Sequence, residues 1–208
     1  TKDSGAWEVV AAETARSCGI EMSECRAQRF GNRHHSFMTE RFDRTDTGRR
    51  IHFASAMTLL GYTDGASHTE GASYLELAEW IIANCDDTDR NLEQLWRRIV
   101  FNISVSNCDD HLRNHGFLLT PQGWRLSPAY DMNPDEYGTG LKLNISENDN
   151  SLDFDLAMSV TPYFGLEPAR AELILAEVKC AVSGWRKLAT KYGISKSEQD
   201  AMERAFRY

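Results

Sequence analysis

The stretch Asn107-Cys108-Asp109-Asp110-His111-Leu112-Arg113-Asn114 is the most informative part of this sequence. It begins where a stripe of apolar residues at helical spacing, over residues 92–103, runs out. Residues 117–126 follow it, and the turn-forming Pro121-Gln122-Gly123 at their centre predicts a β-hairpin. The stretch is therefore expected to be a loop between the end of a buried helix and a hairpin.

Three oxygen-bearing side chains in and after this loop favour phosphoryl transfer. That reaction requires a carboxylate to hold the attacking hydroxyl and divalent cations to neutralise the nucleotide phosphates. Asp109 precedes Asn114 by five residues and Asp131 follows beyond the hairpin, which is the order found in a kinase catalytic loop. Because Mg²⁺ prefers oxygen ligands, Asn114 and Asp131 should hold it while Asp109 faces the hydroxyl.

Three blocks of the sequence resemble the HipA family of bacterial serine/threonine kinases. The blocks are residues 107–118, Leu126-Ser127-Pro128-Ala129-Tyr130-Asp131, and the hinge-like Glu40-Arg41-Phe42-Asp43-Arg44. The resemblance runs from about Trp7 to the end and is strongest over residues 106–134. It implies an α+β, protein-kinase-like fold, in which residues 1–43 are a remnant of the small β-containing N-lobe with its hinge. Residues 44–208 would then form the mostly helical C-lobe.

The resemblance also implies the roles of individual residues. Asp109 would be the catalytic base, and Asn114 and Asp131 would bind Mg²⁺. The residues expected to line the ATP site are Glu40, Arg41, Phe42, His111, Leu112, Arg113, Asn114, Tyr130 and Asp131. Glu8 falls where the family has a Glu on the small-lobe helix, which pairs with a phosphate-contacting Lys.

The phosphate-binding loop and nucleotide Lys of the family lie upstream of Thr1. The chain contains no G-x-G-x-x-G stretch, and Lys2 stands too close to the first predicted helix to be that Lys. The chain also lacks an initiator Met, so we expect a fragment that binds ATP weakly by itself. For the whole protein, the resemblance implies toxin-like growth arrest or persistence. It further implies glutamyl-tRNA synthetase as a protein substrate, and a HipB-like DNA-binding antitoxin through which DNA is met indirectly.

Two other functions stay open from the residues alone. The chain could be a non-catalytic pseudokinase or binding module, although the complete set of Asp109, Asn114 and Asp131 argues against this. His111 and His115, four residues apart beside Asp109, could instead ligate iron or zinc in a His/Asp metalloenzyme. Gly116 and the following strand make a continuous helix there doubtful, so loop histidines are the preferred interpretation.

The bulk composition is that of an ordinary globular chain. It has 208 residues, of which 41% are hydrophobic and 26% are charged, with a formal net charge of −8. That charge argues against direct nucleic-acid binding, which requires excess Lys and Arg. No apolar run approaches the roughly 20 residues of a membrane helix. The five cysteines are widely spaced, with no C-x-x-C pair, which favours reduced thiols and a cytoplasmic protein.

The remaining sequence predicts further elements by pattern. We expect a helix over residues 7–18, strands over 25–30 and 37–42 joined by a turn at Gly31-Asn32, and a mainly helical body after Asp43. A second apolar stripe occupies residues 74–82, and further helices are expected near 152–163, 168–192 and 197–206. Three tryptophans (Trp80, Trp96 and Trp185) are interpreted as core anchors, Arg97-Arg98 as part of a solvated helix face, and His34-His35 as an exposed turn.

Overall fold

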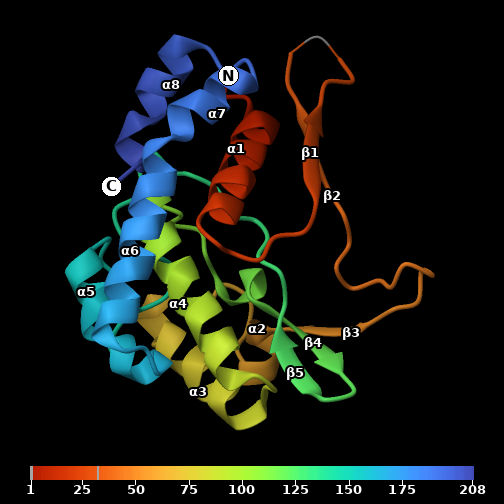
Figure 1. Ribbon diagram of the computed structural model, residues 1–208, viewed down its shortest axis with the longest axis vertical. Helices are drawn as coiled ribbons and strands as arrows, with labels where there is room; N and C mark the ends of the chain where they lie inside the picture. The colour runs from red at the N-terminus through yellow and green to blue at the C-terminus, as the bar shows by residue number, and fades with distance from the viewer. Residues whose placement is uncertain (1, 32) are drawn as a thin grey trace.

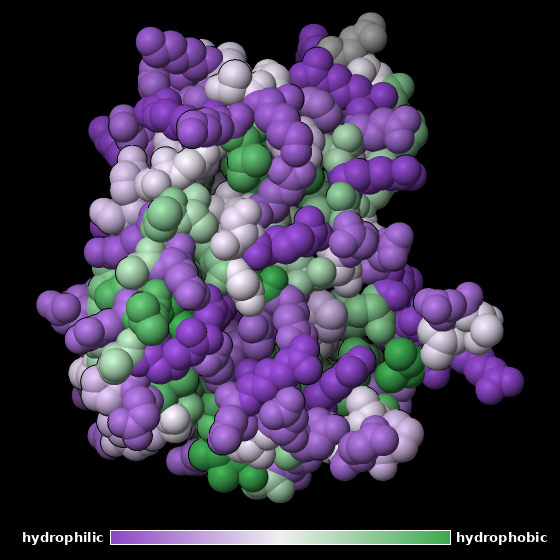
Figure 2. Space-filling view, viewed as in Figure 1, coloured by the Kyte–Doolittle hydropathy of each residue, from purple (hydrophilic) through white to green (hydrophobic). Residues whose placement is uncertain are grey.

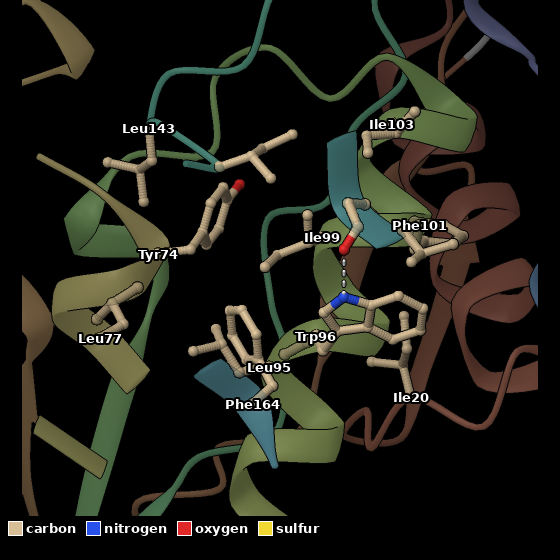
Figure 3. Close-up of a cluster of buried hydrophobic side chains, with 14 of the residues drawn as sticks. Ile20, Tyr74, Leu77, Leu95, Trp96, Ile99, Phe101, Ile103, Leu143 and Phe164 are labelled. Atoms are coloured by element: carbon tan, nitrogen blue, oxygen red, sulfur yellow. Dashed lines mark hydrogen bonds between the residues drawn. The ribbon is translucent and has the colours of Figure 1, made fainter. Parts of the chain in front are cut away.

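α4 (Thr88–Val105) is the helix around which the rest of the chain is arranged, and it lies near the centre of Figure 1. This computed structural model describes residues 2–31 and 33–208. The apolar stripe predicted on α4 is buried, and Trp96 donates its indole N–H to the carbonyl of Ala157 at 3.0 Å in the cluster drawn in Figure 3. α3 (Tyr74–Asn84), α5 (Phe154–Ser159) and α6 (Pro168–Ser183) pack against α4.

α1 (Ser4–Ser17) confirms the helix predicted over residues 7–18, and it begins earlier because Asp3 caps it. The Asp3 carboxylate accepts a hydrogen bond from the backbone N–H of Ala6, as N-cap residues do. α1 packs against α6 and α7 (Trp185–Lys191). There the ring of Trp7 lies 5.8 Å from that of Trp185, which stacks on Phe206 at 4.1 Å. The last residues of the chain thus anchor its first helix.

β1 (Cys25–Gln28) and β2 (Ser36–Thr39) form an antiparallel pair beside α1 (Figure 1). They confirm the two predicted strands, although both are shorter than expected. The turn predicted at Gly31-Asn32 includes residue 32, which lies outside the described residues. Of the two histidines before β2, His34 is exposed, whereas His35 is half-buried with its Nδ1 2.7 Å from Asp3 Oδ2. The prediction of an exposed pair is therefore wrong for His35.

A second antiparallel sheet contains β3 (His52–Ser55), β4 (Gly116–Thr120) and β5 (Gly123–Leu126) in that order. The predicted hairpin is confirmed as β4 and β5. β3 was not expected, because it is an edge strand of four partly exposed residues without a strong apolar alternation. Gly116 leaves room for Phe53 of the neighbouring strand β3, since a Cβ there would lie 2.1 Å from the present position of the Phe53 ring.

The C-terminal helices are shorter than predicted. The single helix expected over residues 168–192 is divided at Gly184 into α6 and α7, so that Trp185 can turn into the contact with α1. The helix expected near 152–163 is α5 followed by a 3₁₀ turn, and α8 (Lys196–Met202) ends before residue 206. The remaining short elements are α2 (Ala56–Leu60), η1 (His68–Glu70), η2 (Leu112–Asn114), η3 (Thr161–Phe164) and η4 (Glu203–Ala205).

The interpretation of Arg97-Arg98 as a solvated face is wrong, since these residues are only 4% and 2% exposed. α4 is enclosed on nearly all sides, so both guanidinium groups need internal partners. Arg97 Nη1 donates to the carbonyl of Cys18 at 2.6 Å and to Glu177 Oε2 at 2.7 Å. Arg98 Nη2 donates to the carbonyl of Ser127 at 2.5 Å.

Two of the three predicted core tryptophans, Trp96 and Trp185, are fully buried, and Trp80 is half-buried against Phe117 of the sheet. The face shown in Figure 2 is mostly hydrophilic, with apolar residues in small separate groups. The five cysteines are free. Among the described residues, no helix combines the length and apolar character needed to cross a membrane.

Candidate active site

The loop after α4 is anchored at Ser106. Ser106 takes a left-handed backbone conformation (φ 50°), and its hydroxyl donates to the carbonyl of Ala205 at 2.9 Å. The backbone N–H of Asn107 returns to the carbonyl of Asn102 at 2.8 Å. The two adjacent aspartates that follow differ in burial: Asp109 is exposed, whereas Asp110 is buried. An exposed carboxylate on an anchored loop is free to accept a hydrogen bond from a substrate hydroxyl, as a general base must.

Asn114 lies at the end of η2 and is 6% exposed. Its side-chain Nδ2 donates to the backbone carbonyl of Asp109 at 3.2 Å, which ties the two ends of the loop together. Its amide oxygen has no hydrogen-bond donor within the described part of the chain. That oxygen is the atom that a hard divalent cation would use.

Asp131 is linked to the same loop through its neighbour. The Tyr130 hydroxyl donates to the backbone carbonyl of Arg113 at 2.6 Å, so the residues adjacent to Asp131 and Asn114 are hydrogen-bonded. Asp131 is exposed and holds a left-handed conformation (φ 57°), which is unusual for a residue with a side chain. One of its carboxylate oxygens accepts from Asn133 at 2.9 Å. Such backbone strain is concentrated at functional sites.

Asp131 shares a cavity of about 220 Å³ with Glu8 of α1. Residues 129–132 form one side of this cavity, and α1 and the β1–β2 pair form the others. Burial and the negative charge of Asp131 raise the pKa of Glu8 from 4.5 to about 7. The two acidic side chains at this cavity provide a site where a cation would be stabilised.

Comparison with known proteins assigns the family. Residues 1–185 match the model of the HipA-like C-terminal domain. The chain belongs to the HipA family. Over 143 residues it is 24% identical to the serine/threonine-protein kinase toxin HipA of Shewanella oneidensis, and over 102 residues it is 26% identical to a putative kinase of Haemophilus influenzae. These matches cover 60% and 46% of the chain, but only 33% and 30% of the two relatives.

Two solved structures share the fold. The first is the Shewanella oneidensis HipA in complex with HipB and operator DNA, with a TM-score of 0.74 at 19% identity. The match covers 96% of this chain and 52% of that HipA chain. The second is the Helicobacter pylori proinflammatory kinase CtkA, with a TM-score of 0.59 at 13% identity, covering 98% and 87% of the two chains. The predicted α+β, protein-kinase-like fold is confirmed, while the division at residue 43 stays a prediction.

The hinge-like segment of this HipA-family chain is only partly directed toward the site. The Phe42 ring stacks on Tyr130 at 5.5 Å, next to the carbonyl contact with Arg113. Arg41 instead donates two hydrogen bonds to Asp43, at 2.8 and 2.6 Å, and lowers the pKa of Asp43 to about 2. Glu40 lines a separate cavity along β1 and β2. The structure therefore brings Phe42 and Tyr130 together, but not the side chains of Glu40 and Arg41.

The cavity that holds Glu8 is not lined by His111, Leu112 or Arg113. With Asp109 they line a second cavity, of about 210 Å³, together with residues 63–66 and Lys142. Arg113 forms an ion pair with Asp64 at 2.8 Å across this cavity, and its Nη2 lies 3.2 Å from His111 Nε2. The predicted base and the predicted metal-binding Asp131 thus line different cavities.

The arrangement of His111 and His115 does not favour the metalloenzyme alternative. His115 is 1% exposed and pairs with Asp110, whereas His111 lies at the cavity edge beside Arg113. Over residues 2–31 and 33–208, no group of three or more His, Cys, Asp or Glu side chains is placed to hold a metal ion. The two histidines therefore take part in separate contacts.

A buried polar cluster beneath the loop was missed by sequence reasoning. Asp110 accepts hydrogen bonds from the Tyr74 hydroxyl (2.6 Å) and Asn102 Nδ2 (2.6 Å), and lies 2.9 Å from His115 Nε2. The amide of Asn107 donates to Asn102 Oδ1 at 3.0 Å. All five residues are 3% exposed or less. The available signal was Asn102, a polar residue inside the apolar stripe of α4, which implies a buried partner.

Proposed function

We propose that this chain supplies the catalytic and metal-binding part of a serine/threonine protein kinase that uses ATP and Mg²⁺. The observation that carries the proposal is the hydrogen-bonded closure of one loop. Asn114 holds the carbonyl of Asp109, and Tyr130, next to Asp131, holds the carbonyl of Arg113. The family and the kinase names of its relatives support the same reaction class.

Three features of these residues support the proposal of a Mg²⁺–ATP complex. The Asn114 amide oxygen has no donor in the described chain, Asp131 is exposed, and the pKa of Glu8 is raised beside Asp131. Mg²⁺ bound with ATP would neutralise the charge on the transferring phosphoryl group. Asn114 and Asp131 would hold that ion, and Phe42 and Tyr130 would border the nucleotide. The carboxylate of Glu8 would pair with a cationic group in the same cavity.

Asp109 would act on the acceptor. Its exposed carboxylate would accept a hydrogen bond from the Ser or Thr hydroxyl, align its oxygen with the γ-phosphorus and take up its proton during transfer. The cavity that Asp109 lines is separate from the Glu8 cavity, so the acceptor and the nucleotide would enter different cavities and meet at the loop.

The test is transfer of ³²P from ATP with Mg²⁺ by the whole protein encoded by the gene. Asp109→Ala should lower the rate by about 10²–10⁴-fold. The matched control is Asp46→Ala, because Asp46 is also exposed but lies in a turn outside the site. Incorporation that is equal in wild type and Asp109→Ala would exclude the proposed base. No incorporation by any of the three proteins would favour the non-catalytic binding module instead.

The partners follow from the relatives. Because a solved HipA of this fold is bound to HipB and operator DNA, we infer a HipB-like antitoxin as partner, with DNA met through it. Glutamyl-tRNA synthetase is the first protein substrate to assay, and toxin-like growth arrest is the expected consequence. Co-purification with a HipB-type protein tests the partner, and ³²P labelling of the synthetase tests the substrate. Failure of either assay alone removes that partner and leaves the phosphoryl-transfer proposal standing.

A further inference from the structure

The buried carboxylate of Asp110 has no place in the proposed reaction, yet it belongs to the same loop as Asp109 and Asn114. It follows Asp109 in the sequence, and its partner His115 follows Asn114. The contact between Asp110 and His115, at 2.9 Å, therefore joins the two ends of the loop that carries both functional side chains. The hydrogen bond from Asn114 to the carbonyl of Asp109 makes a second link of the same length along the chain, offset by one residue.

A carboxylate this deeply buried must be compensated. Burial by itself would raise the pKa of Asp110, but the facing His115, the Tyr74 hydroxyl and the charge of Arg98 outweigh it and lower that pKa below its ordinary value. Asp110 is thus an anion that accepts three contacts, from α3, from α4 and from His115, which lies between η2 and β4. Although His115 Nδ1 has no partner within the described chain, three contacts to one buried anion make this local arrangement strongly preferred over its alternatives.

The same face of α4 reaches the Asp131 segment. Arg98 is one turn before Asn102 on α4, and its guanidinium donates to the carbonyl of Ser127 at 2.5 Å. Ser127 in turn donates its backbone N–H to the carbonyl of Gly116, beside His115. α4 therefore contacts both segments that carry site residues, through Asn102 to Asp110 of the loop and through Arg98 to Ser127, four residues before Asp131.

We propose that Asp110 is the positioning residue of this site: through His115 and Asn102 it fixes the separation of Asp109 and Asn114 that phosphoryl transfer needs. This inference rests on the proposed function for its catalytic part. Asp110 contacts neither the nucleotide cavity nor the acceptor cavity, so it acts only through the loop. Misplacement of reacting groups by about 1 Å can cost roughly 10²-fold in rate.

The experiment compares Asp110→Asn with Asp3→Asn. Asp3 makes a similar buried aspartate–histidine contact, with His35 at 2.7 Å, but it lies at the start of α1. Amide hydrogen exchange is measured for peptides covering residues 107–115 in the whole protein, together with kcat and the KM for ATP. If Asp110 contributed only to overall stability, the amides of residues 107–115 should exchange at the same rate in both variants, because both lose a buried charged contact.

Asp110→Asn is expected to speed exchange in residues 107–115 by about 10-fold or more through local opening. It should also lower kcat by about 10²-fold while KM for ATP changes by less than about 3-fold. Asp3→Asn should speed exchange near α1 and leave the loop amides unchanged. Tyr74→Phe, which removes a single hydrogen bond to Asp110, should also speed amide exchange in residues 107–115 and lower kcat, but by a smaller factor. If Asp110→Asn does not fold, Tyr74→Phe is the variant that tests the inference.

Loop exchange in Asp110→Asn equal to that in Asp3→Asn would overturn the inference, and so would a faster-exchanging loop with unchanged kcat. A loop that opens in Asp110→Asn, in a protein whose wild type transfers no phosphate, would confirm that Asp110 holds the loop and would refute the kinase proposal. The two proposals can therefore fail separately.

Discussion

Asp110 Oδ2 lies 2.9 Å from Nε2 of His115, and both side chains are almost completely buried. This pair joins the two ends of the loop that carries Asp109 and Asn114. The expected consequences for stability, for pH dependence and for nucleotide binding can each be measured.

Asp110→Asn should destabilise the protein at pH 7 by about 3–5 kcal/mol, because it leaves the donors around the site without their anion. The pKa of Asp110 is lowered on folding, so its stabilising contribution is present above its unfolded pKa, near 3.8, and is lost as pH falls through the folded value. The difference between wild type and variant should therefore shrink below about pH 4. Urea unfolding at several pH values measures it, with Asp46→Asn as an exposed control.

Glu8→Gln should have opposite effects on stability and on ligand binding. The pKa of Glu8 is raised from 4.5 to about 7, so its contribution is fully present below pH 4.5 and lost as pH rises through about 7. At about pH 8 the variant should be more stable than wild type by about 1–2 kcal/mol, allowing for solvent screening of a half-buried group. At about pH 4 the two should be equal.

Removal of the Glu8 charge should at the same time weaken the response to Mg²⁺ and ATP. The measurement is the rise in Tm on adding both ligands, compared between wild type and Glu8→Gln. An equal rise in the two proteins would show that Glu8 does not face the ligand cation.

Tyr130→Phe tests the link between the loop and the Asp131 segment. The variant keeps the ring that stacks on Phe42 but removes the 2.6 Å hydrogen bond to the carbonyl of Arg113. We expect a loss of about 0.5–1.5 kcal/mol in the free energy of unfolding and a weaker Mg²⁺–ATP response. Tyr137→Phe is the control, since Tyr137 is 79% exposed, and it should change neither quantity.

Phe206→Ala tests whether the C-terminus anchors α1. The ring of Phe206 stacks on Trp185 at 4.1 Å and lies 6.2 Å from Trp7, so its removal opens the contact between α1 and α7. A half-buried aromatic ring in this position should contribute about 2–3 kcal/mol to stability, below the range for a fully buried Phe. Tyr208→Ala, at a 61% exposed position, should have little effect on unfolding by urea.

Local pattern was sufficient for the elements whose residues alternate or repeat strongly. The stripe on α4 and the Pro-Gln-Gly turn predicted a buried helix and a hairpin, and both are present. β3 was missed because an edge strand with exposed residues carries little apolar periodicity. The division of the last long helix at Gly184 was missed because it depends on the contact of Trp185 with α1, which lies far away in the sequence.

The candidate site divides in the same way. The spacing of Asp109, Asn114 and Asp131 could be read from the sequence, because these residues lie close together along the chain. The partners of Asp110 could not, since Tyr74 is 36 residues away on another helix. Arg98 was misjudged because a charged residue is usually solvated, and only the structure shows that it supports the carbonyl of Ser127.

The most direct test of the shared site is a titration of Mn²⁺, as a Mg²⁺ substitute, into the whole protein with a non-hydrolysable ATP analogue, followed by electron paramagnetic resonance. Nucleotide-dependent Mn²⁺ binding should be lost in both Asn114→Ala and Asp131→Asn, and it should be retained in Asp46→Asn. If Mn²⁺ binding in Asn114→Ala and Asp131→Asn equals that of wild type, these side chains do not converge on one metal–nucleotide site and the account is wrong.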